Sequence, residues 1–210
     1  MRQGRAATGL LGGSFNPAHR AHRRISLAAI DALALDEVWW LVSPGNPLKP
    51  AAGMAPLKAR VASARAAARR APIRVTAIER QLGTRFTVDT LRALTRRYPR
   101  RRFVWIMGAD NLAQFHRWRH WREIARTMPI VVFARPGYGA AAFEGPAMAW
   151  LRRDRVPAHR LAAAPAPALA WIAFDPDTIS ASAIRQADPA WADRYASARP
   201  RDGVTGRLIG

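Results

Sequence analysis

The stretch that decides the fold is TGLLGGSFNPAHRAH, residues 8–22. It opens with a short apolar run that leads into Gly12-Gly13, which is typical of a buried strand ending in a tight turn. Asn16 is a favourable helix N-cap and Pro17 a favourable first helical residue, so we expect a helix over residues 18–33. A strand, a glycine turn and a helix in this order indicate an α/β unit.

The alternation of strands and helices continues through the rest of the chain. Alternation with short loops predicts an α/β fold with a mainly parallel sheet flanked by helices. We expect further strands at residues 38–42, 73–78, 103–107, 130–134 and 169–174, and further helices at 56–70, 88–98, 118–127 and 180–187. Ligands of such sheets bind beyond the carboxyl ends of the strands. The most unusual residues lie at those ends, in segments 12–22, 43–49, 108–118 and 179–185.

The length predicts the domain organisation. We expect residues 1–210 to form a single domain, because a chain of this length suits one full core. From about residue 180 we expect a small helical part. Residues 139–167, rich in Ala, Pro and Arg, are predicted to be a surface excursion, and the tail from Arg199 a loosely ordered segment.

The chain is strongly basic and contains no cysteine. It has 34 Lys+Arg against 14 Asp+Glu, a formal charge of +20, and only Lys49 and Lys58 are lysines. This charge is the usual footprint of a nucleic-acid binder, but a bias toward arginine and alanine at exposed positions explains it equally well. The missing cysteines exclude a disulfide framework, cysteine-ligated zinc and a cysteine nucleophile. No apolar run approaches the roughly 18 residues of a membrane span, so we expect a cytoplasmic protein without a membrane partner.

Two histidines follow the glycine turn at a spacing that suits phosphate binding. His19 and His22 are three residues apart, so they project from the same face of the first helical turns. The helix start presents free backbone N–H groups and the positive end of its dipole, which favours anions. The glycines let a ligand approach the backbone closely. The segment is neither a Walker A loop nor a GxGxxG dinucleotide motif, and no third metal ligand accompanies the histidines.

A second group of polar residues opens the last predicted helix, in ISASAIR at residues 179–185. Ser180 and Ser182 offer hydroxyls and amides at a helix N-terminus, and Arg185 lies one turn further on. These groups suit the same kind of anion. Taken alone, they are explained equally well by a capping serine and a surface arginine.

Together the motifs resemble those of the bacterial nicotinate-nucleotide adenylyltransferase family, within the nucleotidyltransferase superfamily. The first segment is similar to the family's GG(S/T)F(D/N)PxHxGH motif and the last to its IS(S/A)(S/T)xIR motif. Five further segments match in the expected order: NPLK at 46–49, FTVDTL at 86–91, GADN at 108–111, FHRW at 115–118 and RPGY at 135–138. Ala21 replaces the second glycine of the first motif, and the chain beyond Asp188 fits the family's ending poorly.

The resemblance implies a Rossmann-like nucleotidyltransferase fold and an adenylyl transfer. Members of the family move AMP from ATP to nicotinate mononucleotide, giving deamido-NAD and pyrophosphate in NAD biosynthesis. The acceptor phosphate attacks the α-phosphorus in line, and Mg²⁺ assists by bridging phosphate oxygens. The partners implied are therefore ATP and nicotinate mononucleotide, without a specific nucleic acid, and the oligomeric state stays open.

The motif positions also imply roles for individual residues. His19, His22 and Arg185 are the implied catalytic residues. The implied ATP-binding set is Gly12, Gly13, Ser14, Phe15, His19, His22, Gly108, Asp110, Ile179, Ser180, Ser182 and Arg185. The implied acceptor-binding set is Ser14, Phe15, Lys49, Thr87 and Trp118. Within the acceptor set, Thr87 is expected to meet the nicotinate carboxylate and Trp118 to stack on the pyridine ring.

Other functions remain as alternatives. The nearest are an adenylyltransferase for nicotinamide mononucleotide and one for another phosphate acceptor. The helix start at TVDTL favours the acid, because backbone N–H groups at a helix N-terminus suit a carboxylate. A basic nucleic-acid-binding module and an inactive scaffold with the same fold are the alternatives from other classes.

Overall fold

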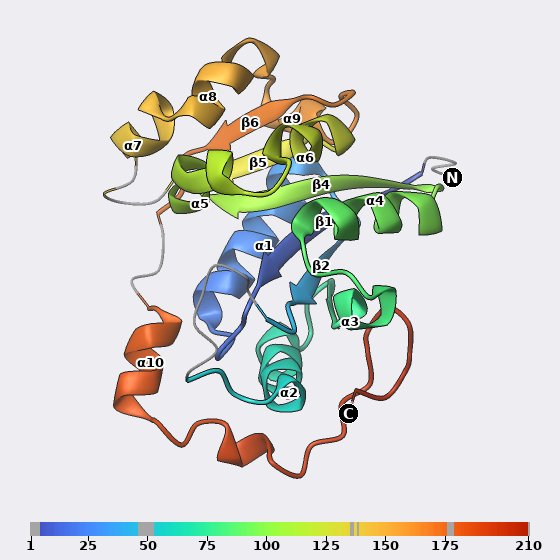
Figure 1. The fold of residues 1–210 in the computed structure, drawn as a ribbon, viewed down its shortest axis with the longest axis vertical. Coiled ribbons are helices and arrows are strands. Elements are labelled where there is room, and N and C mark those ends of the chain that lie inside the picture. The colour runs from blue at the N-terminus through green and yellow to red at the C-terminus, as the bar shows by residue number, and fades with distance from the viewer. Residues whose placement is uncertain (1–4, 46–52, 135–136, 138, 176–178, 210) are drawn as a thin grey trace.

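Six parallel strands form the central sheet (Figure 1). The structure, a computed structural model, describes residues 5–45, 53–134, 137, 139–175 and 179–209. The strand order is β3-β2-β1-β4-β5-β6, and every neighbouring pair is parallel. The strands are β1 (Ala6–Gly13), β2 (Glu37–Val42), β3 (Ile73–Thr76), β4 (Arg101–Gly108), β5 (Ile130–Phe133) and β6 (Leu169–Ile172). The predicted α/β fold with a parallel sheet is confirmed.

Helices cover both faces of this sheet. The longer ones are α1 (Arg20–Leu33), α2 (Leu57–Ala68) and α4 (Thr87–Arg97). The shorter ones are α3 (Ile78–Leu82), α5 (Ala109–Gln114), α6 (Trp121–Thr127), α7 (Gly139–Glu144), α8 (Pro146–Leu151), α9 (Ala158–Leu161) and α10 (Ala181–Ala187), with 3₁₀ turns η1 (Phe115–Arg117), η2 (Arg152–Asp154) and η3 (Asp193–Tyr195). In the described part of the chain, no helix is both long and apolar enough to cross a membrane.

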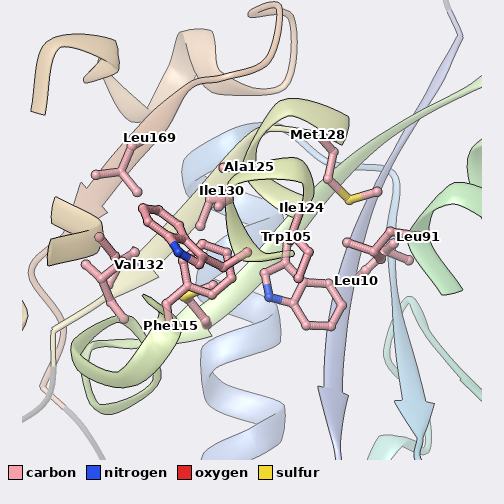
Figure 2. Packing of buried hydrophobic residues seen from close by; sticks show 14 of the residues in the cluster. Leu10, Leu91, Trp105, Phe115, Ile124, Ala125, Met128, Ile130, Val132 and Leu169 are labelled. Atoms are coloured by element: carbon pink, nitrogen blue, oxygen red, sulfur yellow. The ribbon is translucent and has the colours of Figure 1, made fainter. Parts of the chain in front are cut away.

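Neighbouring residues on each strand supply the two layers of the core. Trp39 packs into the cluster that includes residues of α4, α5, α6 and α8. The next residue, Trp40, packs into the opposite cluster with residues of α1, α2 and α9. A strand that is covered on both faces has no solvated side, which explains why its sequence is apolar throughout rather than alternating. Figure 2 shows the first cluster, which brings Phe115 of η1 and Ile124 of α6 together with Trp105 of β4 and Val132 of β5.

The order in which strands are added to the sheet reverses at β1. The chain builds outward from β1 to β2 and β3, and then returns to add β4 on the other side of β1. The helix after β1 belongs to one face of the sheet and the helix after β4 to the other. In parallel sheets this reversal point is where ligands bind, at the carboxyl ends of the strands.

Residues 139–167 do not form the predicted surface excursion. They contain α7, α8, η2 and α9, and Ala142, Leu151 and Leu161 are completely buried. Helices α7 and α8 pack against α5. The prediction is wrong because the few large apolar residues of this segment are spaced for packing, although its overall composition is dominated by Ala, Pro and Arg.

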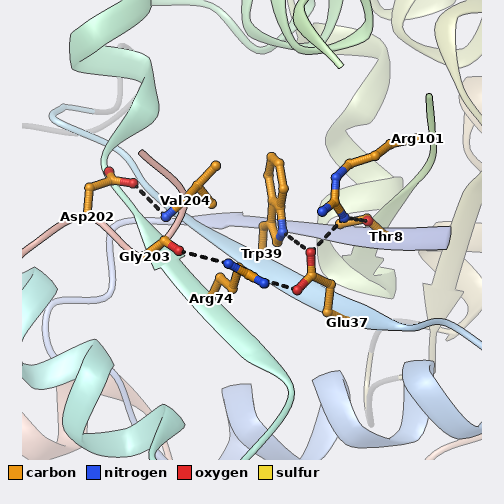
Figure 3. A network of polar contacts seen from close by, with 8 residues as sticks. All are labelled: Thr8, Glu37, Trp39, Arg74, Arg101, Asp202, Gly203 and Val204. Atoms are coloured by element: carbon orange, nitrogen blue, oxygen red, sulfur yellow. Dashed lines mark hydrogen bonds and ion pairs between the residues drawn. The ribbon is translucent and has the colours of Figure 1, made fainter. Parts of the chain in front are cut away.

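The tail is held against β3, so the prediction of a loosely ordered segment is also wrong. After α10 and η3 the chain continues without regular helices, and Asp202 is only 2% exposed. One oxygen of its carboxylate accepts hydrogen bonds from Thr76 Oγ1 and the Ala77 N–H, both at 2.8 Å. The Gly203 N–H donates to the Val75 carbonyl at 2.7 Å. Figure 3 shows Asp202 and Gly203 beside Arg74 of β3.

Candidate active site

The glycine turn after β1 passes close to β4. A Cβ atom on Gly12 would lie 2.6 Å from Cη2 of Trp105, so the position accepts no side chain unless the Trp105 ring moves. Phe15 then adopts a φ of 46°, in the left-handed region that aromatic residues rarely occupy. Its ring is 1% exposed and stacks on Trp40, with 5.0 Å between centroids. Burial of the ring stabilises this turn at the end of the strand.

The two motif histidines lie side by side at the start of α1. Their ring centroids are 3.9 Å apart, and His22 also contacts the Phe15 ring at 4.8 Å. The backbone N–H of His19 donates to Nδ1 of His22 at 3.2 Å. Because Nδ1 accepts this bond, the neutral imidazole of His22 carries its proton on Nε2. His22 is therefore prepared to donate a hydrogen bond through Nε2.

The backbone below His22 is fixed by a buried relay of hydrogen bonds. Trp40 Nε1 donates to the hydroxyl of Ser26 at 2.8 Å, and that hydroxyl donates to the His22 carbonyl at 2.8 Å. Both Trp40 and Ser26 are fully buried. A rigid support of this kind fixes the position of a functional side chain.

Asn16 does not cap the helix, contrary to the sequence-based prediction. Helix α1 begins at Arg20, and His19 occupies its N-cap. The side chain of Asn16 instead donates to the Gly53 carbonyl at 2.9 Å and accepts from the Ala55 N–H at 3.1 Å. It thus joins the turn after β1 to the segment before α2, a long-range contact that local capping rules do not consider.

The two phosphate-type motifs meet in space. Nη1 of Arg185 donates to the Asn16 carbonyl at 2.6 Å, and its Nη2 donates to Ser182 Oγ at 3.2 Å. Ser180 caps α10, accepting from the Ala183 N–H at 3.1 Å. Segments that are 169 residues apart are therefore in direct contact, and the cationic side chain of Arg185 lies beside the turn that leads to His19 and His22.

Two of the residues implied for the acceptor, Thr87 and Trp118, lie in neighbouring segments. The guanidinium of Arg119 is 4.6 Å from the centroid of the Phe86 ring, so the segments that carry Trp118 and Thr87 lie side by side. Threonine is a favourable N-cap residue, but Thr87 is the first helical residue of α4 and Phe86 takes the N-cap position. Trp118 packs edge-on against Phe115, with 5.4 Å between centroids. Lys49 lies outside the described residues.

Gly108 and Asp110 lie at the carboxyl end of β4. Gly108 is the N-cap of α5, and Asp110 lies in the first turn of that helix. A Cβ atom on Gly108 would collide with Oδ1 of Asp110, so the close approach of this carboxylate requires glycine. Ile179 directly precedes Ser180, the N-cap of α10.

Comparison with known proteins identifies the family. A family model described as cytidylyltransferase-like matches residues 10–187. A probable nicotinate-nucleotide adenylyltransferase of Erythrobacter litoralis is 66% identical over 205 residues, which cover 96% of this chain and 94% of that relative. One of Cereibacter sphaeroides is 55% identical over 177 residues, covering 84% of this chain and 95% of the relative. This chain belongs to the nicotinate-nucleotide adenylyltransferase family.

A solved structure supports the fold of this adenylyltransferase. The Plasmodium falciparum nicotinic acid mononucleotide adenylyltransferase complexed with NaAD aligns with a TM-score of 0.65 at 14% sequence identity. The alignment covers 86% of this chain and 83% of that one. The two proteins therefore share a fold.

Sequence reasoning missed two charged side chains near the site of this adenylyltransferase. Arg60 of α2 is 1% exposed, and Nη1 of its guanidinium donates to the Ser14 and Ser43 carbonyls. Burial raises the pKa of Glu79 in α3 to about 7, although hydrogen bonds with Ser43 and Thr90 act in the opposite direction. The one available signal for Arg60 was its spacing of four residues from Ala64 on the buried face of α2. The same helix carries a second arginine, Arg65, which is exposed, so the sequence alone does not distinguish the buried one.

Proposed function

We propose that this protein transfers the AMP group of ATP to nicotinate mononucleotide, forming deamido-NAD and pyrophosphate in NAD biosynthesis. The observation that carries the proposal is the contact between Arg185 and the Asn16 carbonyl. It joins the two phosphate-type motifs at the carboxyl end of β1. The adenylyltransferase names of the relatives that cover nearly the whole chain support the same activity. We also propose that residues 1–210 act as a single nucleotidyltransferase domain.

The reaction needs positioning and charge neutralisation more than a strong base. An oxygen of the acceptor's 5′-phosphate, already an anion, forms a bond to the α-phosphorus of ATP. The bond from that phosphorus to the oxygen bridging to the β-phosphate breaks, and pyrophosphate leaves with the electron pair. Two anions must be held in line while negative charge shifts toward the leaving group, which fixed hydrogen-bond donors achieve well.

The residues that follow β1 and those at the start of α10 suit that task. His22 would donate through Nε2 to phosphate oxygens near the reacting phosphorus, with His19 beside it. Arg185 has five N–H donors, so its bonds to Asn16 and Ser182 leave others for the triphosphate. Ser180, Ser182 and Ile179 would hold the leaving pyrophosphate, and Gly108 and Asp110 the nucleoside side of ATP. Gly12, Gly13, Ser14 and Phe15 would line the junction of the two substrates.

Nicotinate mononucleotide would bind beside Thr87 and Trp118. The start of α4 supplies backbone N–H groups and a dipole that suit the carboxylate of the nicotinate ring. Trp118 would stack on the pyridine, and Lys49 would contact the acceptor phosphate. The preference for the acid over the amide follows from this helix start, because an uncharged amide gains less from it.

Mg²⁺ would enter the site together with ATP. Among the described residues, no three or more His, Asp or Glu side chains are grouped so that they could hold a metal ion. Mg²⁺ retains several waters and binds readily to substrate phosphates, so an ion that ATP carries into the site does not need such a group of protein ligands. When bound, it would neutralise charge on the phosphate oxygens. We propose a cytoplasmic location and no specific nucleic-acid partner.

The test is pyrophosphate release measured with ATP plus nicotinate mononucleotide, and with each substrate alone. Release that requires both substrates, together with formation of deamido-NAD, is the expected result. A parallel assay replaces the acceptor with nicotinamide mononucleotide. Faster turnover of the amide would overturn the assignment of the acid, and no turnover with either mononucleotide would overturn the activity itself.

A further inference from the structure

We propose that Arg60 is a positioning residue for the adenylyl transfer: its buried guanidinium fixes the loops that follow β1 and β2 relative to each other. The inference rests on the proposed function. Arg60 belongs to none of the matching motifs, and its guanidinium donates to backbone carbonyls.

The guanidinium of Arg60 binds backbone carbonyls from three separate segments. Its Nη1 donates to the Ser14 carbonyl after β1 at 2.8 Å and to the Ser43 carbonyl after β2 at 2.7 Å. Nη2 donates to the Pro44 carbonyl at 3.2 Å, and Nε donates to the Ala55 carbonyl at 2.9 Å. Only a planar fork of N–H donors can satisfy carbonyls in so many directions at once.

The burial of this charge is costly, which argues against a role in packing alone. Arg60 is 1% exposed, and none of the ion pairs found among the described residues includes it. Burial lowers the pKa of the guanidinium, but arginine keeps its proton in proteins. An apolar side chain of similar volume would fill the space at lower cost. What arginine adds is the set of bonds to the two strand ends, together with a positive charge close to a phosphate-binding loop.

A short chain of hydrogen bonds connects Arg60 to the catalytic side. Ala55 receives the bond from Arg60 at its carbonyl, and its N–H donates to the side chain of Asn16 at 3.1 Å. The carbonyl of Asn16 in turn accepts from Arg185 at 2.6 Å. A shift of the loops held by Arg60 would therefore displace the turn between Ser14 and His19 as well as the contact that orients Arg185. Misplacement by about 1 Å at such a distance can cost on the order of 100-fold in rate.

The experiment compares Arg60→Lys, Arg60→Met and Arg60→Ala with Arg69→Lys and Arg69→Met. Arg69 is exposed at the C-terminal end of the same helix, so its variants match the change in charge and composition. The kcat and both KM values are measured with ATP and nicotinate mononucleotide, and the folded fraction is measured by circular dichroism. We expect Arg60→Lys to fold and to lose on the order of 100-fold in kcat with little change in either KM. Free guanidinium, far below denaturing concentration, should restore part of the kcat of Arg60→Ala.

A second measurement does not depend on turnover. Hydrogen–deuterium exchange of the substrate-free protein should become faster in residues 12–16 and 43–45 of Arg60→Lys, and stay unchanged in β4 and β5. A folded Arg60→Lys or Arg60→Met protein with wild-type kcat would overturn the proposal, even if its melting temperature were lower. If the wild-type protein does not turn over these substrates, the proposed function fails. The exchange result then decides by itself whether Arg60 holds the two loops.

Discussion

At the scale of single residues, the hydrogen bond between the His19 N–H and His22 Nδ1 determines what His22 can do. It leaves the proton on Nε2, so the neutral ring is a donor toward phosphate. Replacing His22 with alanine is expected to lower kcat by about 10²- to 10³-fold, as for other fixed donors to a developing charge. The measurement is kcat together with the melting temperature. His159→Ala, an exposed histidine on α9, is the control, and a near-normal kcat for His22→Ala would contradict the assigned role.

Glu79 provides a second prediction at this scale, about pH. Burial raises its pKa to about 7 from the ordinary glutamate value of about 4.5. Between these two pH values the folded protein keeps a proton that the unfolded chain has released, so stability falls as the pH rises through this window. Relative to Glu79→Gln, the wild-type protein should lose up to about 3 kcal/mol in free energy of unfolding between pH 5 and pH 8.

Urea unfolding at both pH values measures this difference. Glu144→Gln, which removes an exposed carboxylate from α7, is the matched variant. Parallel pH profiles of the wild-type and Glu79→Gln proteins would contradict the prediction.

Among the elements, a polar network at the amino ends of the strands joins four members of the sheet (Figure 3). Glu37 of β2 accepts from Arg74 of β3 at 2.6 Å and from Arg101 of β4 at 2.7 Å. Arg101 also donates to Thr8 of β1 at 2.8 Å. Burial would raise the pKa of Glu37, but hydrogen bonds from Arg74 and Trp39 and the charges of Arg74 and Arg101 outweigh it, so the pKa is lowered.

This network should stabilise the sheet without affecting catalysis, because it lies at the opposite end from the site. Glu37→Gln is expected to reduce the free energy of unfolding by about 2 kcal/mol at pH 7, the scale of lost hydrogen bonds to charged groups. A group with a lowered pKa stabilises the protein above its unfolded value, here about 4.5, and loses that effect as the pH falls through the folded value. The deficit of the variant should therefore shrink below pH 4.5, with kcat unchanged throughout. A constant deficit across pH would contradict the role of the charge.

The helices and strands also differ in how well the sequence predicts them. The strands were predictable because both faces of the sheet are covered, which makes runs such as residues 38–42 wholly apolar. The start of α1 was misplaced because Asn16 satisfies Gly53 and Ala55 rather than its own helix. Arg60 was missed for a related reason: its role depends on three segments that only the fold brings together. Local rules describe neighbours in sequence, and such long-range polar contacts escape them.

At the scale of the whole molecule, the C-terminal tail extends the packed structure to the edge strand β3. Besides its bonds to Thr76 and Ala77, the carboxylate of Asp202 accepts from the Val204 and Thr205 N–H groups, both at 2.9 Å. Asp202→Ala leaves these donors without the carboxylate; two of them, Thr76 Oγ1 and the Ala77 N–H, are buried, and the change should cost about 3 kcal/mol in free energy of unfolding. Thermal and urea unfolding measure it, and Asp193→Ala in η3 is the control. A loss well below 1 kcal/mol would show that the tail is only loosely coupled to the sheet.

The charge of +20 also belongs to the whole molecule, and the structure indicates how to interpret it. Arginines are spread over many elements, and several lie against aromatic rings, such as Arg122 over Trp121 at 4.5 Å and Arg101 over Trp39 at 5.0 Å. A dispersed charge of this kind attracts polyanions without reading their sequence. Binding to short DNA or RNA should therefore weaken by about 10³- to 10⁵-fold between 50 and 200 mM salt, as expected for 6–10 phosphate contacts.

Affinity for two unrelated sequences of equal length, measured across this salt range, provides the comparison. The adenylyl transfer should keep its turnover over the same range, because its donors are fixed close to the two substrates and are screened less than dispersed surface charges. Tight, sequence-selective binding that persists at 200 mM salt would restore nucleic-acid recognition as a function of this protein. Loss of that binding with turnover retained would leave the surface arginines as a weak steering field around a small-molecule site.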